Sequence, residues 1–128
     1  MEQILKELLE KAYAPYSNYK VAAVVVTHNN EIFKGVNVEN ASYGATICAE
    51  RNAILNAVTN GHQKGDFKEL YVMVDSDKIA SPCFICRQVI SEFFTNDAQI
   101  ILMNKDGQKE SYTVLDLCPK PFNDEDLK

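Results

Sequence analysis

The sequence predicts an α/β protein with a three-layer αβα sandwich, in which a five-stranded mixed sheet is covered by helices on both faces. Segments with helical spacing of apolar residues alternate with short β-branched runs, in the order α-β-β-α-β-α-β-β-α. The chain of 128 residues has the length of one domain, so residues 1–128 are expected to form a single folded unit.

The first half of the chain supplies a helix, a strand pair and a second helix. An apolar stripe at helical spacing consists of Ile4, Leu5, Leu8, Leu9 and Ala12. Residues 19–27 and 31–38 are rich in β-branched side chains and predict two strands joined by a tight turn. After a loop over residues 39–46, residues 48–58 again show helical spacing.

The second half repeats the alternation. Residues 68–75 predict a third strand, and residues 83–94 predict a helix after a loop. Residues 98–104 and 110–114 predict two strands around a turn. A short helix over residues 114–118 and a polar tail complete the pattern.

Composition and charge exclude several classes of function. The net charge is −5 and the basic residues are scattered, so no nucleic-acid partner is expected. The chain contains no apolar run of about eighteen residues, which argues against a membrane span. The acidic, amphipathic first segment does not resemble a secretion signal, so a cytoplasmic location is expected. Four cysteines in that reducing compartment favour metal binding or catalysis over disulfides.

Three of the cysteines fall at predicted helix N-termini. Cys48 opens the helix over residues 48–58, and Cys83 and Cys86 lie one turn apart at the start of the helix over residues 83–94. Free N–H groups and the partial positive charge of helix N-termini stabilise thiolates. Two such helices packed on one sheet would bring the three sulfurs around one ion. Three protein ligands with one open position describe a catalytic zinc site, whereas four describe a structural one.

Glu50 and Arg51 follow Cys48 directly. Glu50 is placed to lie beside a metal without binding it, where a carboxylate takes a proton from an activated water and passes it to a substrate. Three thiolates leave a Zn²⁺ centre with a net negative charge, which weakens it as a Lewis acid. Arg51 is therefore expected to donate hydrogen bonds to the sulfurs and offset this charge.

The motif "CAE" followed by "PCxxC" resembles the zinc-dependent deaminase superfamily. The segments "AYAPYS", "GVNVENASY", "ICAERNAI", "SPCxxCRQVI" and a late "PF" followed by acidic residues resemble the small cytidine deaminases in particular. The resemblance runs in the same order from about Tyr13 to Leu127, which is nearly the whole chain. Several spaced motifs together are far more specific than the cysteine spacing alone.

The resemblance implies a cytidine deaminase-like fold and the hydrolytic deamination of cytidine and deoxycytidine in pyrimidine salvage. It implies one zinc ion per subunit, a homotetramer with active sites completed by neighbouring subunits, and Glu50 as the catalytic proton carrier. The metal ligands that match the family are Cys48, Cys83 and Cys86.

The same resemblance implies a set of substrate contacts. Asn37 and Glu39 match residues that bind the ribose hydroxyls, and at i and i+2 in an extended chain their side chains point the same way. Tyr19 matches an aromatic residue near the nucleoside, and the backbone of Ala49 matches a contact to the base. Phe122 matches an aromatic residue that reaches the base from a neighbouring subunit.

Three alternatives remain open. The same zinc motifs occur in deaminases of cytosine-containing antibiotic nucleosides such as blasticidin S. A non-catalytic zinc module would use Cys118 as a fourth sulfur ligand. A polynucleotide-editing deaminase is disfavoured by the missing basic patch. One departure concerns packing, since Phe84 and Ile85 stand between the paired cysteines where the family often has small residues.

Overall fold

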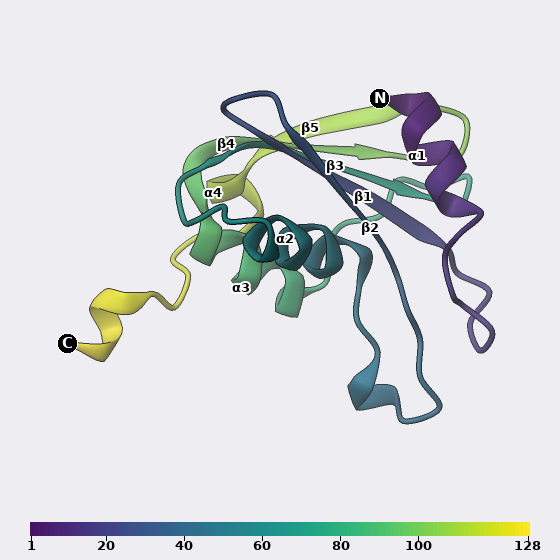
Figure 1. Cartoon of the computed structure of the whole chain (residues 1–128), viewed down its shortest axis with the longest axis horizontal. Helices are drawn as coiled ribbons and strands as arrows, with labels where there is room; N and C mark the ends of the chain where they lie inside the picture. Colours follow the sequence, from purple (N-terminus) through teal and green to yellow (C-terminus); the bar gives the residue numbers. More distant parts are fainter.

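The structure is a computed structural model that describes residues 1–128, and its centre is a five-stranded mixed sheet (Figure 1). The strand order is β2-β1-β3-β4-β5. β1 pairs antiparallel with β2 and β3, β3 pairs parallel with β4, and β4 pairs antiparallel with β5. The strands are β1 (Val21–Thr27), β2 (Ile32–Val36), β3 (Phe67–Val74), β4 (Phe94–Met103) and β5 (Lys109–Thr113).

Helices cover both faces of the sheet and complete three layers. They are α1 (Glu2–Leu9), α2 (Ala49–Thr59), α3 (Phe84–Phe93) and α4 (Val114–Leu117). α1 lies on one face, and α2, α3 and α4 lie on the other (Figure 1). The expected αβα sandwich and the predicted order of elements are confirmed.

Each face of the sheet has its own hydrophobic core. The core under α1 joins Leu5, Leu8 and Leu9 to apolar side chains of β1, β3 and β4. The larger core includes Ala53 and Ile54 of α2 together with apolar side chains of β1, β3 and β4, α3 and α4. β1 contributes to both cores, which explains why its sequence is a continuous apolar run rather than an alternating one.

α2 lies unusually close to the edge strand β2. A Cβ atom at Gly35 would lie 2.3 Å from the backbone nitrogen of Ala53 and 2.5 Å from the carbonyl oxygen of Ala49. Asn52 of α2 donates from Nδ2 to the carbonyl oxygen of Val36 at 2.7 Å. Glycine is therefore required at position 35, and this contact sets the height of α2 above the sheet.

The element boundaries differ from the prediction by a few residues, most clearly in two places. α1 ends at Leu9, before the predicted Ala12, because the chain then turns and Tyr13 bonds to the backbone of Asn37 and Glu39. β4 begins at Phe94 directly after α3, where a helix end and a short connection were expected. The structure also contains two short 3₁₀ turns, Tyr43–Ala45 and Asp124–Leu127, that the sequence pattern did not indicate.

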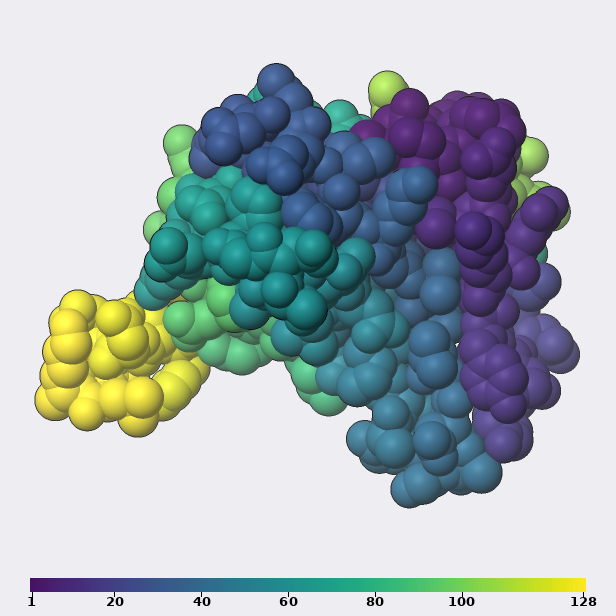
Figure 2. Space-filling model, viewed as in Figure 1, coloured from purple at the N-terminus to yellow at the C-terminus, as the bar shows by residue number.

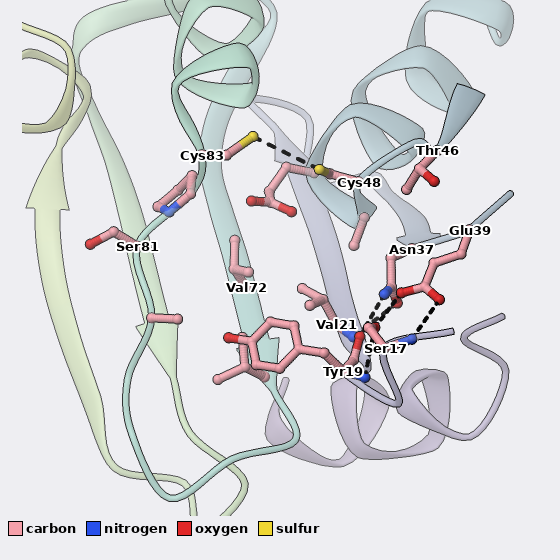
Figure 3. A pocket seen from close by; sticks show the side chains of 15 residues that line it. Ser17, Tyr19, Val21, Asn37, Glu39, Thr46, Cys48, Val72, Ser81 and Cys83 are labelled. Atoms are coloured by element: carbon pink, nitrogen blue, oxygen red, sulfur yellow. Dashed lines mark hydrogen bonds between the residues drawn. The ribbon is translucent and has the colours of Figure 1, made fainter. Parts of the chain in front are cut away.

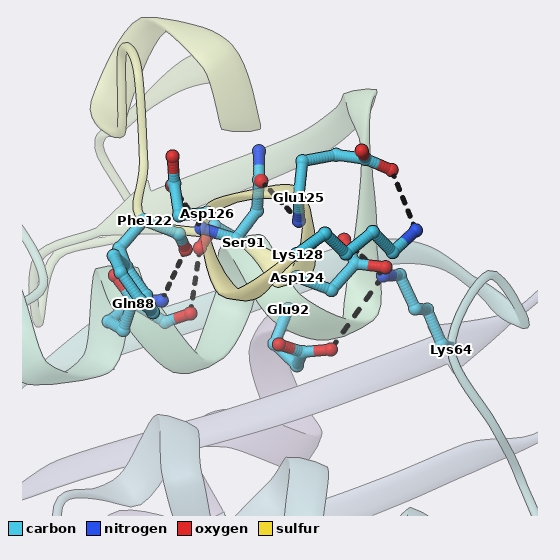
Figure 4. A network of polar contacts seen from close by, with 10 residues as sticks. Lys64, Gln88, Ser91, Glu92, Phe122, Asp124, Glu125, Asp126 and Lys128 are labelled. Atoms are coloured by element: carbon cyan, nitrogen blue, oxygen red, sulfur yellow. Dashed lines mark hydrogen bonds and ion pairs between the residues drawn. The ribbon is translucent and has the colours of Figure 1, made fainter.

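The C-terminal segment, which is the part of the chain that follows α4, extends away from the body of the molecule (Figures 1 and 2). Few contacts tie this segment to α3. Gln88 Nε2 of α3 donates to the carbonyl oxygen of Phe122 at 2.8 Å. Lys64 bridges the two, since its Nζ lies 3.7 Å from Glu92 of α3 and 4.0 Å from Asp124 of the segment (Figure 4).

None of the helices has the length and hydropathy needed to cross a membrane.

Candidate active site

Two helix N-termini bring three cysteine sulfurs together. Cys48 occupies the N-cap position of α2 without a side-chain capping bond, Cys83 caps α3, and Cys86 lies in the first turn of α3. The Cys48 and Cys83 sulfurs are 3.8 Å apart (Figure 3), and all three Sγ atoms lie within 4.8 Å of one another. Cys86 also donates its backbone N–H to the Cys83 sulfur at 3.5 Å. The predicted cluster is therefore present in the folded chain.

The spacing of the sulfurs fits a zinc ion. Thiolates about 2.3 Å from a tetrahedral Zn²⁺ lie about 3.8 Å from each other, which matches the separation of Cys48 and Cys83. All four cysteines are free thiols, and Cys118 does not belong to the cluster. The chain thus offers three sulfur ligands and leaves a fourth position open, as in catalytic rather than structural zinc sites.

The electrostatics of the cluster favour a thiolate at Cys48. Hydrogen bonds from Cys86, and then from Arg51 and Cys83, lower the pKa of Cys48 to about 5. The pKa of Cys86 is raised, because its thiol hydrogen-bonds to Cys48 and is buried. A thiolate at Cys48 is the form in which a cysteine binds a metal ion.

Arg51 lies against the cluster as the sequence predicts. Its Nη2 donates to the Cys48 sulfur at 3.4 Å, and this bond is the main reason that the pKa of Arg51 is raised. Its Nε is buried without a hydrogen-bond partner. The guanidinium therefore places positive charge beside the sulfurs, which is the offset that three thiolates around Zn²⁺ require.

Glu50 is a buried carboxylate in the first turn of α2. Its side chain is 5% exposed and lines the same cavity as Cys48 and Cys83. Burial, and then the negative charge of Cys48, raise the pKa of Glu50 to about 7, although hydrogen bonds and the nearby Arg51 oppose the shift. A carboxyl group with this pKa both accepts and releases protons near neutral pH.

Cys48 and Cys83 of the sulfur cluster lie at one end of an open cavity of about 480 Å³, a size typical of small-molecule sites. Val72 and Val74 at the end of β3, with Ala80 and Pro82 of the following loop, form an apolar wall between the ends, which Ser81 interrupts. The opposite end is polar and carries Ser17, Asn37 and Glu39 (Figure 3). A ligand in the cavity would therefore meet sulfur and carboxylate at one end and hydrogen-bonding groups at the other.

Asn37 and Glu39 face the cavity together, as their i, i+2 spacing predicts. Asn37 is almost fully buried and also holds the neighbouring backbone. Its Nδ2 donates to the carbonyl oxygen of Tyr19 at 2.7 Å, and its Oδ1 accepts from the N–H of Val21 at 3.0 Å. One N–H and one lone pair of the amide remain for a ligand.

The other predicted contacts are divided between the cavity and the surface. Tyr19 and Ala49 line the cavity, and burial followed by the charge of Glu50 raises the pKa of Tyr19. Phe122 does not reach the cavity of its own chain; it is 56% exposed in the C-terminal segment. This position is compatible with the expected contact to a neighbouring subunit and does not test it.

Ser17 and Thr46 are among the cavity residues that were not assigned from the sequence. Ser17 belongs to the "AYAPYS" segment and contacts Glu39, and Thr46 lies next to the first cysteine helix. Their hydroxyl groups carry no spacing signal of their own. Only the folded chain brings them to the cavity, through the Tyr13–Val38 and Val38–Ile47 bridges.

The αβα fold and three thiols around an open position beside a buried carboxylate define the class of zinc-dependent hydrolytic enzymes. Residues 1–102 match the family model described as the cytidine and deoxycytidylate deaminase zinc-binding region. The chain belongs to this family.

Several cytidine deaminases are similar in sequence to this chain over nearly its full length. A cytidine deaminase of Sporosarcina psychrophila is 42% identical over 95% of this chain and 88% of its own length. A cytidine deaminase of Mycoplasma genitalium is 38% identical over 95% of both chains. The crystal structure of cytidine deaminase from Burkholderia pseudomallei superposes with a TM-score of 0.90 at 41% identity, covering 94% of each chain.

Proposed function

We propose that the protein is a cytidine deaminase, which hydrolyses cytidine and deoxycytidine to uridine and deoxyuridine with release of ammonia. The observation that carries this proposal is the position of Glu50, buried next to the three-sulfur cluster at one end of a cavity whose opposite end is polar and carries Asn37 and Glu39. The family, and relatives named cytidine deaminase at 36–42% identity, support it.

Cys48, Cys83 and Cys86 would hold one zinc ion per subunit, and Arg51 would donate to the sulfurs from outside the ligand set. Bound zinc supplies a Lewis acid that activates water at neutral pH. The sulfur end of the cavity is where C4 of the cytosine ring must lie for attack. The backbone of Ala49, next to Cys48, lines this end and is placed to hold the base.

Glu50 would carry the protons of the reaction. Its carboxylate would take one proton from water and give it to N3 of the ring while the water oxygen bonds to C4. It would then take the remaining proton from the C4 hydroxyl and deliver it to the amino group, so that the bond from C4 to the amino nitrogen breaks, ammonia leaves and C4 becomes a carbonyl. Water is consumed and no electrons are transferred. A pKa near neutrality suits a group that must both accept and donate within one turnover.

Asn37 and Glu39 would bind the sugar hydroxyls, and Tyr19 would pack near the nucleoside. An amide and a carboxylate together donate to and accept from hydroxyl groups. The charged side chains that line the cavity are both acidic, Glu39 and Glu50, and no lysine or arginine lines it. A free nucleoside therefore fits better than a nucleotide, because phosphate favours arginine or lysine.

We also propose that the protein works as a homotetramer in the cytoplasm, in pyrimidine salvage. Large apolar side chains on the helix side are exposed in the single chain: Phe84 is 77% exposed and Ile85 is 62% exposed. Tyr43 and Phe122 are exposed as well, on segments that extend from the body. Association of subunits would bury these groups and bring Phe122 to a neighbouring cavity.

The test is ultraviolet-monitored conversion of cytidine to uridine by the purified protein, with zinc measured on the same sample. Turnover with about one zinc per chain is expected. Bound zinc without turnover on cytidine or deoxycytidine would contradict the proposal. Turnover on blasticidin S in their place would establish the antibiotic nucleoside as the substrate.

A further inference from the structure

Ser17 makes the most extensive contacts among the cavity residues that the sequence did not assign. Its hydroxyl donates to Oε2 of Glu39, and the backbone N–H groups of Tyr16 and Ser17 donate to Oε1 at 3.0 and 3.1 Å. The Ser17 hydroxyl oxygen in turn accepts from the backbone N–H of Tyr19 at 3.0 Å. Ser17 thus links the two cavity residues Tyr19 and Glu39 (Figure 3).

These contacts leave Glu39 with little freedom. A carboxylate offers about four acceptor positions, two on each oxygen. Two backbone amides occupy Oε1, and Ser17 occupies one position on Oε2. One acceptor position remains for a ligand, and it lies on the oxygen that Ser17 holds. The two backbone amides hold Oε1, and the Ser17 hydroxyl is the one group that holds the oxygen carrying this free position.

The segment that carries Ser17 is itself fixed. Asn18 donates its backbone N–H to the carbonyl oxygen of Ala14 at 2.9 Å and closes the turn that contains Pro15. Asn18 has a positive φ of 57°, which asparagine adopts more readily than most residues. Hydrogen bonds from Ser17, and then from the backbone of Tyr16, lower the pKa of Glu39. The hydrogen bonds that hold the Glu39 carboxylate thus also favour its ionised form.

We propose that Ser17 is a positioning residue for the substrate sugar: it orients Glu39 so that the free acceptor position on Oε2 faces a sugar hydroxyl. The proposal rests on the proposed function, in which Glu39 binds the ribose. Ser17 does not touch the reacting atoms and acts only through Glu39. Its removal should therefore weaken substrate binding without slowing the chemical step.

The experiment compares Ser17→Ala, Ser17→Thr and wild type in the zinc-loaded protein. For Ser17→Ala, KM for cytidine should rise about tenfold while kcat changes less than about twofold, as expected when an interaction common to ground and transition states is lost. The inhibition constant of 2′,3′-dideoxycytidine, which lacks the sugar hydroxyls that Glu39 would bind, should change less than about twofold. Ser17→Thr keeps the hydroxyl, so its KM for cytidine should stay close to that of wild type.

A double-mutant cycle separates positioning from general damage. In a Glu39→Gln background, Ser17→Ala should raise KM less than about twofold, because the group that it positions is already altered. Ser111→Ala, which removes an exposed hydroxyl on β5, serves as the control and should leave both constants unchanged.

The outcomes distinguish the two proposals. Wild-type protein that does not turn over cytidine would refute the proposed function. With an active wild type, an unchanged KM in Ser17→Ala, an equal loss for cytidine and dideoxycytidine, or no recovery in Ser17→Thr would refute the role of Ser17 alone.

Discussion

Glu50 and Cys48, two residues apart at the start of α2, differ in how their surroundings affect their protons. Cys48 receives hydrogen bonds that favour its thiolate, whereas burial favours the neutral form of Glu50. One helix turn therefore presents a thiol that loses its proton readily and a carboxyl group whose pKa lies near neutral pH. We expect the first to bind the metal and the second to carry protons.

Replacement of Glu50 by alanine should abolish proton transfer and leave the metal site intact. The three sulfurs do not depend on the carboxylate, so zinc content should remain near that of wild type. The rate constant kcat should fall by about 10²–10⁴, the usual contribution of a positioned acid–base group. Glu10→Gln, an exposed carboxylate of the turn after α1, is the matched control. Retained activity in Glu50→Ala would refute the assigned role.

Replacement of Arg51 by alanine should weaken zinc retention. The guanidinium donates to Cys48 and offsets the charge of the thiolates. Replacement of residues that hydrogen-bond to metal ligands typically lowers metal affinity or activity about 10–100-fold. Competition with a chelator measures the change in zinc affinity, and turnover measures the change in Lewis acidity. If the variant kept both the zinc affinity and the turnover of wild type, Arg51 would have no role in zinc binding or catalysis.

At the level of elements, the contact between α2 and β2 controls where Cys48 and Glu50 lie. Gly35→Ala would place a methyl group against the backbone of Ala49 and Ala53, which cannot move without shifting the helix. Overpacking of this kind costs about 1–3 kcal/mol of unfolding free energy, and kcat should fall because the start of α2 moves.

Gly44→Ala is the matched control for the Gly35 variant, since a Cβ at Gly44 meets nothing within 4 Å. Its free energy of unfolding should stay within about 0.5 kcal/mol of wild type. Denaturant titration of both variants decides the point. Equal stability of Gly35→Ala and wild type would show that α2 adapts to the methyl group.

Periodicity and β-branched runs were sufficient to predict the order of the elements, because each helix and strand has a single strong pattern. They failed where tertiary contacts set a boundary. Ala12 continues the apolar stripe of α1, but the bonds of Tyr13 to Asn37 and Glu39 draw the chain away from the helix. Phe94 reads as the last helical residue, yet it pairs with Phe67 as the first residue of β4.

The site was predictable to the extent that its residues lie in motifs. Cys48, Cys83 and Cys86 are brought together as expected, and Glu50, Asn37, Glu39, Tyr19 and Ala49 line one cavity. The catalytic and binding roles of these residues stay predictions. Ser17 was missed because a serine hydroxyl is common at turns, and only the fold shows that it faces a carboxylate 22 residues away.

At the level of the whole molecule, the exposed apolar side chains at the start of α3 predict association. Ile85→Glu would place a charge in the proposed interface, so light scattering after size exclusion should show a smaller species than wild type. Activity should fall with the loss of assembly, because Phe122 then has no neighbouring cavity to enter. Lys109→Glu on the exposed edge strand β5 is the control. An unchanged mass for Ile85→Glu would place the interface elsewhere.

The two cores described above also divide the molecule by local stability. The core opposite the metal site is closed by α1, an eight-residue helix whose first turn has no side-chain cap. Detachment of α1 exposes Leu5, Leu8 and Leu9 but leaves α2, α3 and the sulfurs on the other face in place. In a hydrogen-exchange experiment, the amides of α1 should exchange fastest among the helices, and zinc should not change their exchange rate. Zinc should slow exchange at the starts of α2 and α3. We therefore expect local opening to begin on the face remote from the site, while the site itself stays assembled.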